Sequence, residues 1–402
     1  MEREYKDSGI PWMKHIPTDW NVVRGKDFLF LRNRPVREDD DVVTCFRDGE
    51  VVLRCERRTE GFTMSDKEIG YQGINKGDIV IHGMDGFAGA MGVSKSTGKG
   101  SPVLIVCNPK SDDDARYIIY YLRSLAMNNV FVALATGIRE RSCDLRWNKI
   151  SVLPFVRPSS IEQTRIADYI DEKCVEIDSL IALQEQMIEK LKAYKQSVIT
   201  EAVTKGLDPN AKLVPSGIDW IGEIPEGWKV CRIKDLVIMK SGSNLTSEQI
   251  ANEGSYPVYG GNGLRGYYEA YSNEGDYVLV GRQGALCGNI NYAFGRFWAT
   301  DHAVVCYPRR NFSLIWFGET LRSMNLGQYS LSAAQPGLSV DRIREKKMPL
   351  PPLSEQQTIA SYLDEKCADI DRLIALKQQK IESLKDYKKS VIYEAVTGKT
   401  EI

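Results

Sequence analysis

The chain has 402 residues, of which 43% are hydrophobic and 27% charged, and its formal net charge is −1. This length suits two or three domains, and no run of about 18 apolar residues predicts a membrane span. The near-neutral balance excludes a uniformly basic coat for nucleic acid but leaves room for local basic faces.

The N-terminal residues and the cysteines indicate where in the cell the protein is found. The charged N-terminus, MEREYKDSG, does not have the pattern of a signal peptide. Nine cysteines occur without a CxxC pair, as expected for reduced thiols. We therefore expect a cytoplasmic protein.

The chain begins with a segment that it contains twice. Residues 8–20 read SGIPWMKHIPTDW, and residues 216–228 read SGIDWIGEIPEGW. A globular region follows each copy. In the first region, short β-like runs at 42–46, 49–55, 77–83 and 101–107 precede an amphipathic helix predicted at 114–126.

A longer repeat follows each globular region. Residues 162–204 and 355–397 match without a gap at about two thirds of their positions. Each copy has apolar residues at alternating steps of four and three, a pattern that predicts coiled-coil helices. We expect them to start at capping boxes formed by Ser159 with Glu162 and by Ser354 with Gln357, and to stop at Gly206 and Gly398. The predicted seam comprises Ile170, Cys174, Ile177, Ile181, Ile188, Leu191 and Val198, then Leu363, Cys367, Ile370, Ile374, Ile381, Leu384 and Val391.

The second globular region shares the order of elements of the first but little of its sequence. Its β-like runs are followed by a helix predicted at 314–324, and a polar linker joins the two units. We predict an α+β fold: two related domains joined by two long helices in an antiparallel coiled coil, with pseudo-two-fold symmetry. This arrangement places the domains at opposite ends of a rod.

These repeats resemble the specificity subunit of type I restriction-modification systems over essentially the whole chain. The resemblance is carried by LPPLSEQQTIASYLDEK, IEQTRIADYIDEK, VYGGNG, VGRQGALCGNI and FWATDHAVV. It implies target-recognition domains at 1–157 and 218–352, spacer helices at 158–205 and 353–399, and a linker at 206–217. One departure is visible, since the first helix follows RPSSIEQ instead of PPLSEQ.

The resemblance also implies a function. Each domain would read one half of a bipartite double-stranded DNA target, and the coiled coil would set the gap and dock two methyltransferase subunits. Restriction and translocase subunits would join for cleavage. The alternative is a non-enzymatic coiled-coil scaffold whose two heads bind proteins.

The sequence predicts no catalysis by this chain. It has neither a P-loop nor an Asn/Asp-Pro-Pro-aromatic motif, and its three histidines are scattered without metal-ligand spacing. By the resemblance, S-adenosylmethionine, ATP and Mg belong to partner subunits.

Candidate DNA-contacting residues follow from side-chain chemistry. Arg and Gln suit guanine and adenine edges, and Lys and Ser suit phosphates. The glycines at 82–92 and 260–263 suit tight turns, with close approach to a phosphate as the alternative. The candidates are Lys95, Ser96, Lys99, Arg139, Arg141, Arg146, Arg265, Arg282, Gln283 and Gln335.

The start of each long helix repeats residues that lie before the main seam. Docking of identical methyltransferases on an exposed face would explain the repetition, and so would recent duplication. The candidate docking residues are Glu162, Gln163, Ile166 and Ala167, with Glu355, Gln356, Ile359 and Ala360.

Overall fold

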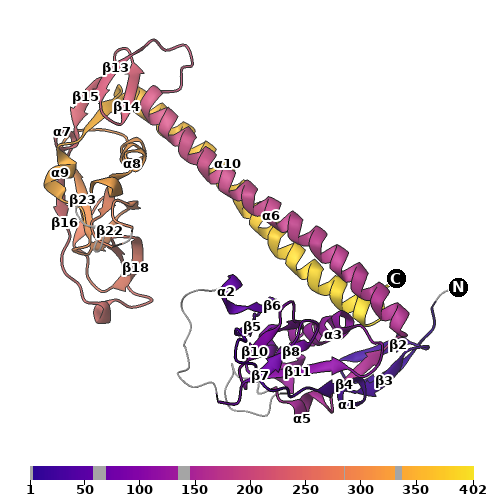
Figure 1. The fold of residues 1–402 in the computed structure, drawn as a ribbon. Coiled ribbons are helices and arrows are strands. Elements are labelled where there is room, and N and C mark those ends of the chain that lie inside the picture. The colour runs from indigo at the N-terminus through magenta and orange to yellow at the C-terminus, as the bar shows by residue number, and fades with distance from the viewer. Residues whose placement is uncertain (1–2, 58–68, 135–144, 285, 331–336) are drawn as a thin grey trace. The chain divides into compact units, whose positions relative to one another are not determined.

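The chain forms two compact units, each containing one globular domain and one end of each long helix. The computed structural model describes residues 3–57, 69–134, 145–284, 286–330 and 337–402. Unit 1 combines residues 1–184 with 379–402, and unit 2 comprises residues 185–378. Both domains mix sheets with helices, so the predicted α+β class is confirmed (Figure 1).

The domain of unit 1 is built on a four-stranded antiparallel sheet in the order β4-β11-β8-β9. Helix α3 covers one face because its buried residues, including Tyr117, Tyr121 and Leu125, recur on one side. Its elements are β1 (Tyr5–Ile10), β2 (Met13–Pro17), β3 (Asn21–Arg24), α1 (Gly25–Phe28), β4 (Leu29–Leu31), β5 (Val43–Cys45), β6 (Val51–Leu53), α2 (Arg54–Arg57), β7 (Gln72–Ile74), β8 (Ile79–His82), η1 (Gly86–Ala88), β9 (Met91–Val93), β10 (Gly98–Gly100), β11 (Leu104–Pro109), α3 (Ala115–Met127), α4 (Val130–Ala133), α5 (Trp147–Ile150) and β12 (Pro154–Arg157).

The domain of unit 2 repeats this frame, with main-sheet order β16-β23-β20-β21, and adds a second four-stranded sheet, β18-β17-β22-β19. Its elements are β13 (Leu213–Ile218), β14 (Ile221–Pro225), β15 (Lys229–Arg232), α7 (Ile233–Leu236), β16 (Val237–Ser241), η2 (Ser247–Gln249), β17 (Tyr256–Gly260), β18 (Gly263–Tyr268), β19 (Asn273–Glu274), β20 (Tyr277–Gly281), β21 (Ile290–Ala293), β22 (Arg296–Ala299), β23 (Ala303–Pro308), α8 (Leu314–Ser323), η3 (Leu326–Tyr329), α9 (Val340–Arg344) and β24 (Lys347–Leu350).

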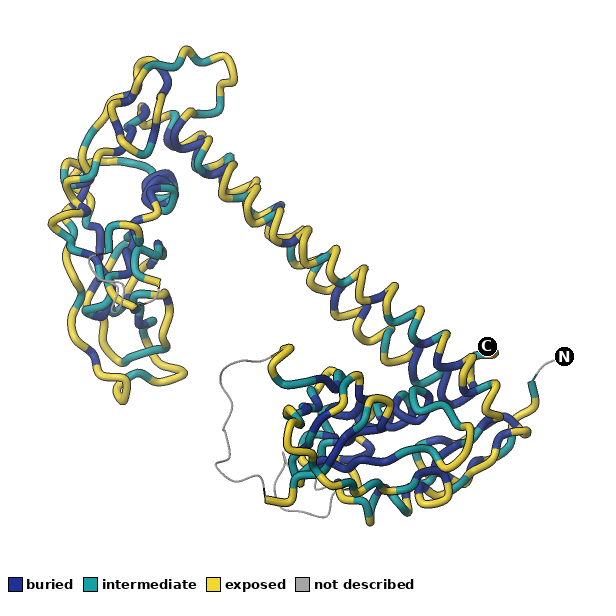
Figure 2. The backbone as a smooth tube through the Cα atoms, in the orientation of Figure 1, coloured by how far each residue is buried: buried dark blue, intermediate teal, exposed yellow. Residues whose placement is uncertain are grey.

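The long helices are α6 (Ser160–Lys205) and α10 (Leu353–Val396), and they pack antiparallel. In unit 2, Lys195 of α6 pairs with Asp371 of α10, and in unit 1, Lys388 of α10 pairs with Asp178 of α6. Figure 2 shows buried residues gathered in the domains and near the helix ends, whereas the helix middles are mostly exposed.

Both predicted C-terminal ends of the long helices match, and the capping box predicted at Ser159 with Glu162 is half formed, since the carboxylate of Glu162 accepts from Arg3 and Trp20 instead. Gly206 and Gly398 have φ of 74° and 71°, the left-handed conformation that stops a helix. At the start of α6, the Oγ of Ser159 accepts from the backbone N–H of Glu162. The capping box predicted at Ser354 is wrong, because α10 already begins at Leu353.

Candidate nucleic-acid interface

Two strands of the main sheet of unit 2 end together at one edge. β16 and β20 both pair antiparallel with β23, so they run in the same direction. Arg282 directly follows β20, and its Nη1 lies 3.1 Å from Oγ of Ser241 at the end of β16. Its backbone N–H donates to the carbonyl of His302 over 2.8 Å, and the neighbouring Gln283 is exposed. We call Ser241, Arg282, Gln283 and His302 edge 2.

The hairpin between β17 and β18 packs its glycine-rich tip against edge 2. A Cβ on Gly281 would lie 2.1 Å from the carbonyl oxygen of Gly261, and a Cβ on Gly261 would lie 3.2 Å from the carbonyl oxygens of Gln283 and His302. Only glycine permits such close approach of two backbones. The tip therefore supports edge 2 by backbone packing, which is one purpose of the glycines at 260–263.

Arg265 lies on the same hairpin, in β18. It is exposed, and its Nη2 lies 3.3 Å from Oγ of Ser247. Its aliphatic stem covers Gly260, where an added Cβ would come within 2.5 Å of Cδ. Gln335 lies outside the described residues. Among the candidates of unit 2, the structure thus brings Arg282 and Gln283 together.

Unit 1 has different residues at the equivalent edge. β8 pairs with β11 in the register that β20 has with β23, so Gly83 takes the place of Arg282. The two units also share the backbone hydrogen bond that this residue accepts. The backbone N–H of Leu145 donates to the carbonyl of Gly83 over 2.8 Å, as that of Leu338 does to the carbonyl of Arg282 over 2.9 Å.

Charged side chains surround this edge of unit 1. Arg47, in the turn between β5 and β6, pairs with Asp85 at 2.8 Å, and both remain solvent-accessible. The Nδ1 of His82 accepts from the backbone N–H of Asp85. Burial lowers the pKa of His82, and this favours the neutral ring that can accept. We call Arg47, His82, Met84, Asp85 and Arg146 edge 1.

The other candidates of unit 1 do not reach edge 1. Lys95, Ser96 and Lys99 follow β9, whose last residue Val93 pairs with Ile79 at the start of β8. They therefore lie toward the opposite end of that strand pair. Lys95 is exposed and donates to Glu50, Ser96 is half-buried, and the backbone N–H of Lys99 donates to Asp41. Arg139 and Arg141 lie outside the described residues.

The repeated residues at the helix starts make contacts inside their own units. Gln163 is fully buried, and its Oε1 accepts from the backbone N–H of Asp114 while its Nε2 donates to Asp113 and the carbonyl of Pro158. Gln356 likewise accepts from Ser313 and donates to the carbonyl of Pro351.

The sequence interpretation placed these eight residues on an exposed face, and this requires correction. Five of the side chains are buried by their own unit, so internal packing explains the repetition of those five. Glu162, Glu355 and Ala360 are half-buried, whereas Gln163, Ile166, Ala167, Gln356 and Ile359 are buried.

Burial along the seam is uneven. Every residue from 178 to 187 and from 371 to 380 is half-buried or exposed. The predicted seam residues fall into two groups. Ile170, Ile177, Ile188, Val198, Leu363, Ile370, Ile381, Leu384 and Val391 are buried, and Cys174, Ile181, Leu191, Cys367 and Ile374 are half-buried.

Each unit also carries an exposed apolar surface beside the seam, which the sequence search for docking residues missed. Tyr387 and Leu180 directly precede the seam positions Lys388 and Ile181, so they flank the seam on the same side. Their counterparts in unit 2 are Tyr194 and Leu373. Surface 1 consists of Leu180 (46% exposed), Leu183 (45%) and Tyr387 (55%), and surface 2 of Leu373 (46%), Leu376 (54%) and Tyr194 (58%).

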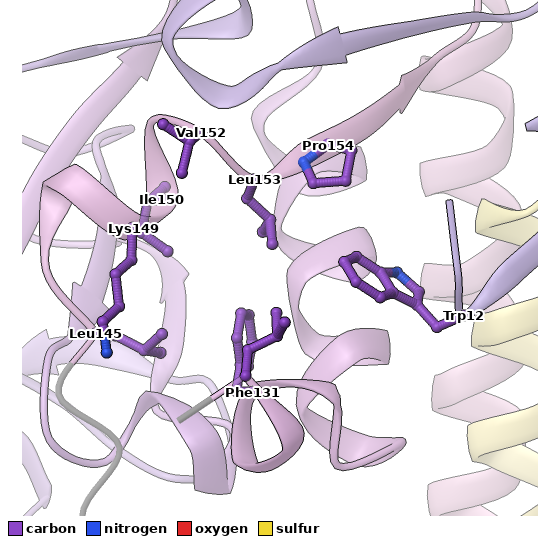
Figure 3. A pocket seen from close by; sticks show the side chains of 9 residues that line it. Trp12, Phe131, Leu145, Lys149, Ile150, Val152, Leu153 and Pro154 are labelled. Atoms are coloured by element: carbon purple, nitrogen blue, oxygen red, sulfur yellow. The ribbon is translucent and has the colours of Figure 1, made fainter. Parts of the chain in front are cut away.

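An apolar cavity of about 290 Å³ lies in the domain of unit 1 (Figure 3). Apart from Lys149, its lining is hydrophobic, with Trp12 and Phe131 as the largest side chains. At the aligned position in unit 2, Glu345 stands for Val152 and pairs with Lys234 and Arg232. Such a lining offers little polar chemistry for a reaction.

The described residues hold neither a candidate metal site nor a candidate membrane span. Within those residues, three or more His, Cys, Asp or Glu side chains nowhere gather as metal ligands. In the same part of the chain, no helix is long and apolar enough to cross a membrane.

Known sequences similar to this chain are specificity subunits of type I restriction enzymes. The family described as "Type I restriction modification DNA specificity domain" matches residues 225–386. The MjaVIII specificity subunit of a type I restriction enzyme from Methanocaldococcus jannaschii is 23% identical, and the alignment covers 99% of this chain and 97% of that protein. Over nearly its full length, the chain is therefore similar to a type I restriction-modification specificity subunit. This chain is also 40% identical to the EcoprrI specificity subunit of Escherichia coli, over 32% of this chain and about a third (33%) of that protein.

Solved structures support the fold of this chain. One, from a study of complex assembly and conformational transition in a type I restriction-modification system, aligns with a TM-score of 0.73 at 15% identity, covering 96% of this chain and 99% of that one. The HsdS subunit from Thermoanaerobacter tengcongensis aligns with a TM-score of 0.54 at 16% identity, covering 96% and 98%. The predicted architecture of two domains and antiparallel long helices is therefore confirmed.

Proposed function

We propose that this chain is the specificity subunit of a type I restriction-modification system and that it reads a bipartite double-stranded DNA sequence, with one half read by each domain. We assign the two target-recognition domains to residues 1–157 and 218–352 and the linker to residues 206–217, the last five of which begin strand β13. The observation that carries the proposal is the contrast between the two edges. The same strand order presents Arg282 and Gln283 in unit 2 but Gly83 and Met84 in unit 1. Different side chains on one frame suit different half-sites.

The side chains of edge 2 suit direct reading of bases. Arg282 can donate two hydrogen bonds to O6 and N7 of guanine, and Gln283 can pair with N6 and N7 of adenine in the major groove. Because Ser241 accepts from Arg282, the guanidinium is oriented before DNA arrives. We assign Lys95, Ser96, Lys99 and Arg265 to phosphates, which set register. Arg139, Arg141, Arg146 and Gln335 complete the proposed DNA-contacting set.

The spacer helices, residues 158–205 and 353–399, set the number of base pairs between the half-sites. At about 1.5 Å per residue, α6 spans roughly two turns of B-DNA. A methyltransferase then receives an adenine that is flipped out of the duplex. We propose that this chain is non-catalytic, that the methyltransferase binds S-adenosylmethionine, and that ATP and Mg serve restriction and translocase subunits.

We propose surfaces 1 and 2 as the docking sites of two methyltransferase subunits. Exposed Leu and Tyr side chains beside a two-helix seam suit contact with further helices, which would bury them. Each unit supplies two Leu and one Tyr. Identical partners would therefore meet the same chemistry twice, as a two-fold arrangement requires.

The test is genome-wide adenine methylation, measured in cells that contain this chain with a cognate methyltransferase and in matched cells that lack the chain. We expect a split motif that depends on the chain, and it would give both half-sites and the gap. If methylation does not change, DNA binding by the reconstituted complex is measured at rising salt. Binding that is independent of salt, or absent, would favour the scaffold whose heads bind proteins.

A further inference from the structure

A buried tryptophan joins the domain of each unit to the start of a long helix. In unit 1, Nε1 of Trp20 donates to Oε2 of Glu162 over 3.0 Å, and in unit 2, Nε1 of Trp228 donates to Oε2 of Glu355 over 2.9 Å. Trp20 is 0% and Trp228 8% exposed. An indole N–H that binds a carboxylate in such a buried place makes a strong, directional contact.

The same tryptophans touch the end of the other long helix. A Cβ on Gly398 would lie 3.1 Å from Cη2 of Trp20, and a Cβ on Gly206 would lie 3.2 Å from Cζ2 of Trp228. Each tryptophan thus contacts the first turn of one helix and the glycine that follows the end of the other. We call Trp20, Glu162 and Gly398 joint 1, and Trp228, Glu355 and Gly206 joint 2.

The seam between the helices discriminates poorly between registers. An apolar repeat of seven residues keeps its pattern after a shift of one heptad. The middles of the helices contribute little to fixing the register, because residues 178–187 and 371–380 are not buried. The seam positions there also include polar residues, Gln184 in α6 and Lys377 in α10.

The ion pairs between the helices do not exclude this shift either. Lys195 pairs with Asp371 and Lys388 with Asp178. Asp364 lies one heptad before Asp371, and Asp171 lies one heptad before Asp178. A single shift by one heptad would therefore give both lysines a new aspartate.

We propose that joints 1 and 2, rather than the seam, fix the register of α6 against α10. The tryptophans are then positioning residues, which act through the helices that they hold. A one-heptad slip moves the helices by about 10 Å. If the proposed function holds, that slip changes the gap between half-sites by about three base pairs, at roughly 34 Å per ten base pairs.

The test reads the register directly and needs no DNA. A carbodiimide joins a lysine amine to a carboxylate in contact with it, and mass spectrometry of the digested full chain identifies the pair. The unaltered chain should give Lys195–Asp371 and Lys388–Asp178. A chain carrying Trp20→Phe and Trp228→Phe should show at least a tenfold higher ratio of Lys195–Asp364 and Lys388–Asp171 to these native pairs.

A matched variant tests the seam. Ile181→Ser with Ile374→Ser weakens two half-buried seam positions and should leave the native pairs unchanged. Slipped pairs in the seam variant would overturn the proposal. The proposal would also be overturned if the Trp→Phe variant unfolds cooperatively on heating and gives only the native crosslinked pairs.

Methylation by the assembled complex gives a second readout. The Trp→Phe variant should add a second gap, about three base pairs different, with both half-sites unchanged. Absence of any split motif with the unaltered chain would count against the proposed function, and the crosslinks would still decide the register.

Discussion

The Nζ of Lys195 lies 2.7 Å from both carboxylate oxygens of Asp371, and Lys388 meets Asp178 in the same way. The two pairs occupy equivalent positions of the two similar helices. In a parallel alignment without offset, Lys195 would face Lys388 and Asp178 would face Asp371. The charges therefore favour the antiparallel alignment, because the parallel one places like charges together.

Reversing the lysine charges should destabilise the helix pair. We expect Lys195→Glu with Lys388→Glu to lower the free energy of unfolding by about 1 kcal/mol at low salt, since exposed pairs contribute ~0.2–1 kcal/mol each. Adding Asp371→Lys and Asp178→Lys should restore it. Urea unfolding measures both changes. Lys192→Glu is the matched control because Lys192 pairs with Glu189 on its own helix. An equal loss in that control would argue against cross-helix attraction.

Loss of the buried amide at the start of α6 should be costly. Gln163→Leu removes hydrogen bonds to Asp113, Asp114 and Pro158 and leaves buried polar groups unsatisfied. We expect a loss of about 2 kcal/mol or more in the free energy of unfolding. The exposed Gln186→Leu should change it by less than about 0.5 kcal/mol. Equal effects of the two substitutions would contradict the structural role of Gln163.

Removing one apolar surface should remove one partner. Leu180→Ser, Leu183→Ser and Tyr387→Ser together should reduce bound methyltransferase from two subunits to one by light scattering. The equivalent changes in surface 2 should do the same, and both sets combined should abolish binding. The exposed Glu185→Ser provides a control away from these surfaces. Two subunits still bound to the combined variant would place docking elsewhere.

Arg282→Ala should change recognition at one half-site only. A bidentate contact from Arg to guanine contributes about 1–3 kcal/mol of discrimination. We expect methylation to tolerate other bases at one position of the second half-site while the first half-site and the gap remain. Arg309 follows β23 at the opposite edge of the same sheet, so Arg309→Ala is the matched control. Identical motifs in both variants would remove Arg282 from base reading.

Thiol reactivity should follow burial. Burial raises the pKa of Cys45 to about 12 and that of Cys306 to about 12, so little thiolate forms at pH 8. Cys55 is exposed. The test uses a chain with Cys143→Ser, because Cys143 lies outside the described residues. In this chain, maleimide should label Cys55 on the order of a thousandfold faster than Cys45 or Cys306. Similar rates in the folded chain would indicate that these thiols are accessible.

The long-range organisation of this chain could be predicted because repetition and periodicity are properties of the sequence. The two copies of the long-helix sequence, each followed by a glycine, predicted the tandem α+β architecture. Strand runs such as 77–83 and 101–107 fall on β8 and β11 because a short run of consecutive apolar residues, buried in both strands, leaves a local signal.

Other features depend on register, which a single sequence does not reveal. Lys95 and Lys99 lie toward the end of the sheet opposite edge 1 because β9 pairs with the start of β8. Arg47 was missed since its turn reaches edge 1 only through tertiary packing. Gln163 and Gln356 are repeated residues, and repetition alone does not distinguish a buried internal contact from an external one.

Unit 1 is completed by the end of the chain. Ile392, Ala395 and Val396 from the last turns of α10 belong to the same hydrophobic core as Trp20 and Phe155. A ribosome releases the N-terminal domain first but supplies these three side chains last. During synthesis, the first domain to emerge is therefore the last to close its core, and it exposes an apolar groove until α10 arrives. A premature stop near the C-terminus would damage the domain that was made first.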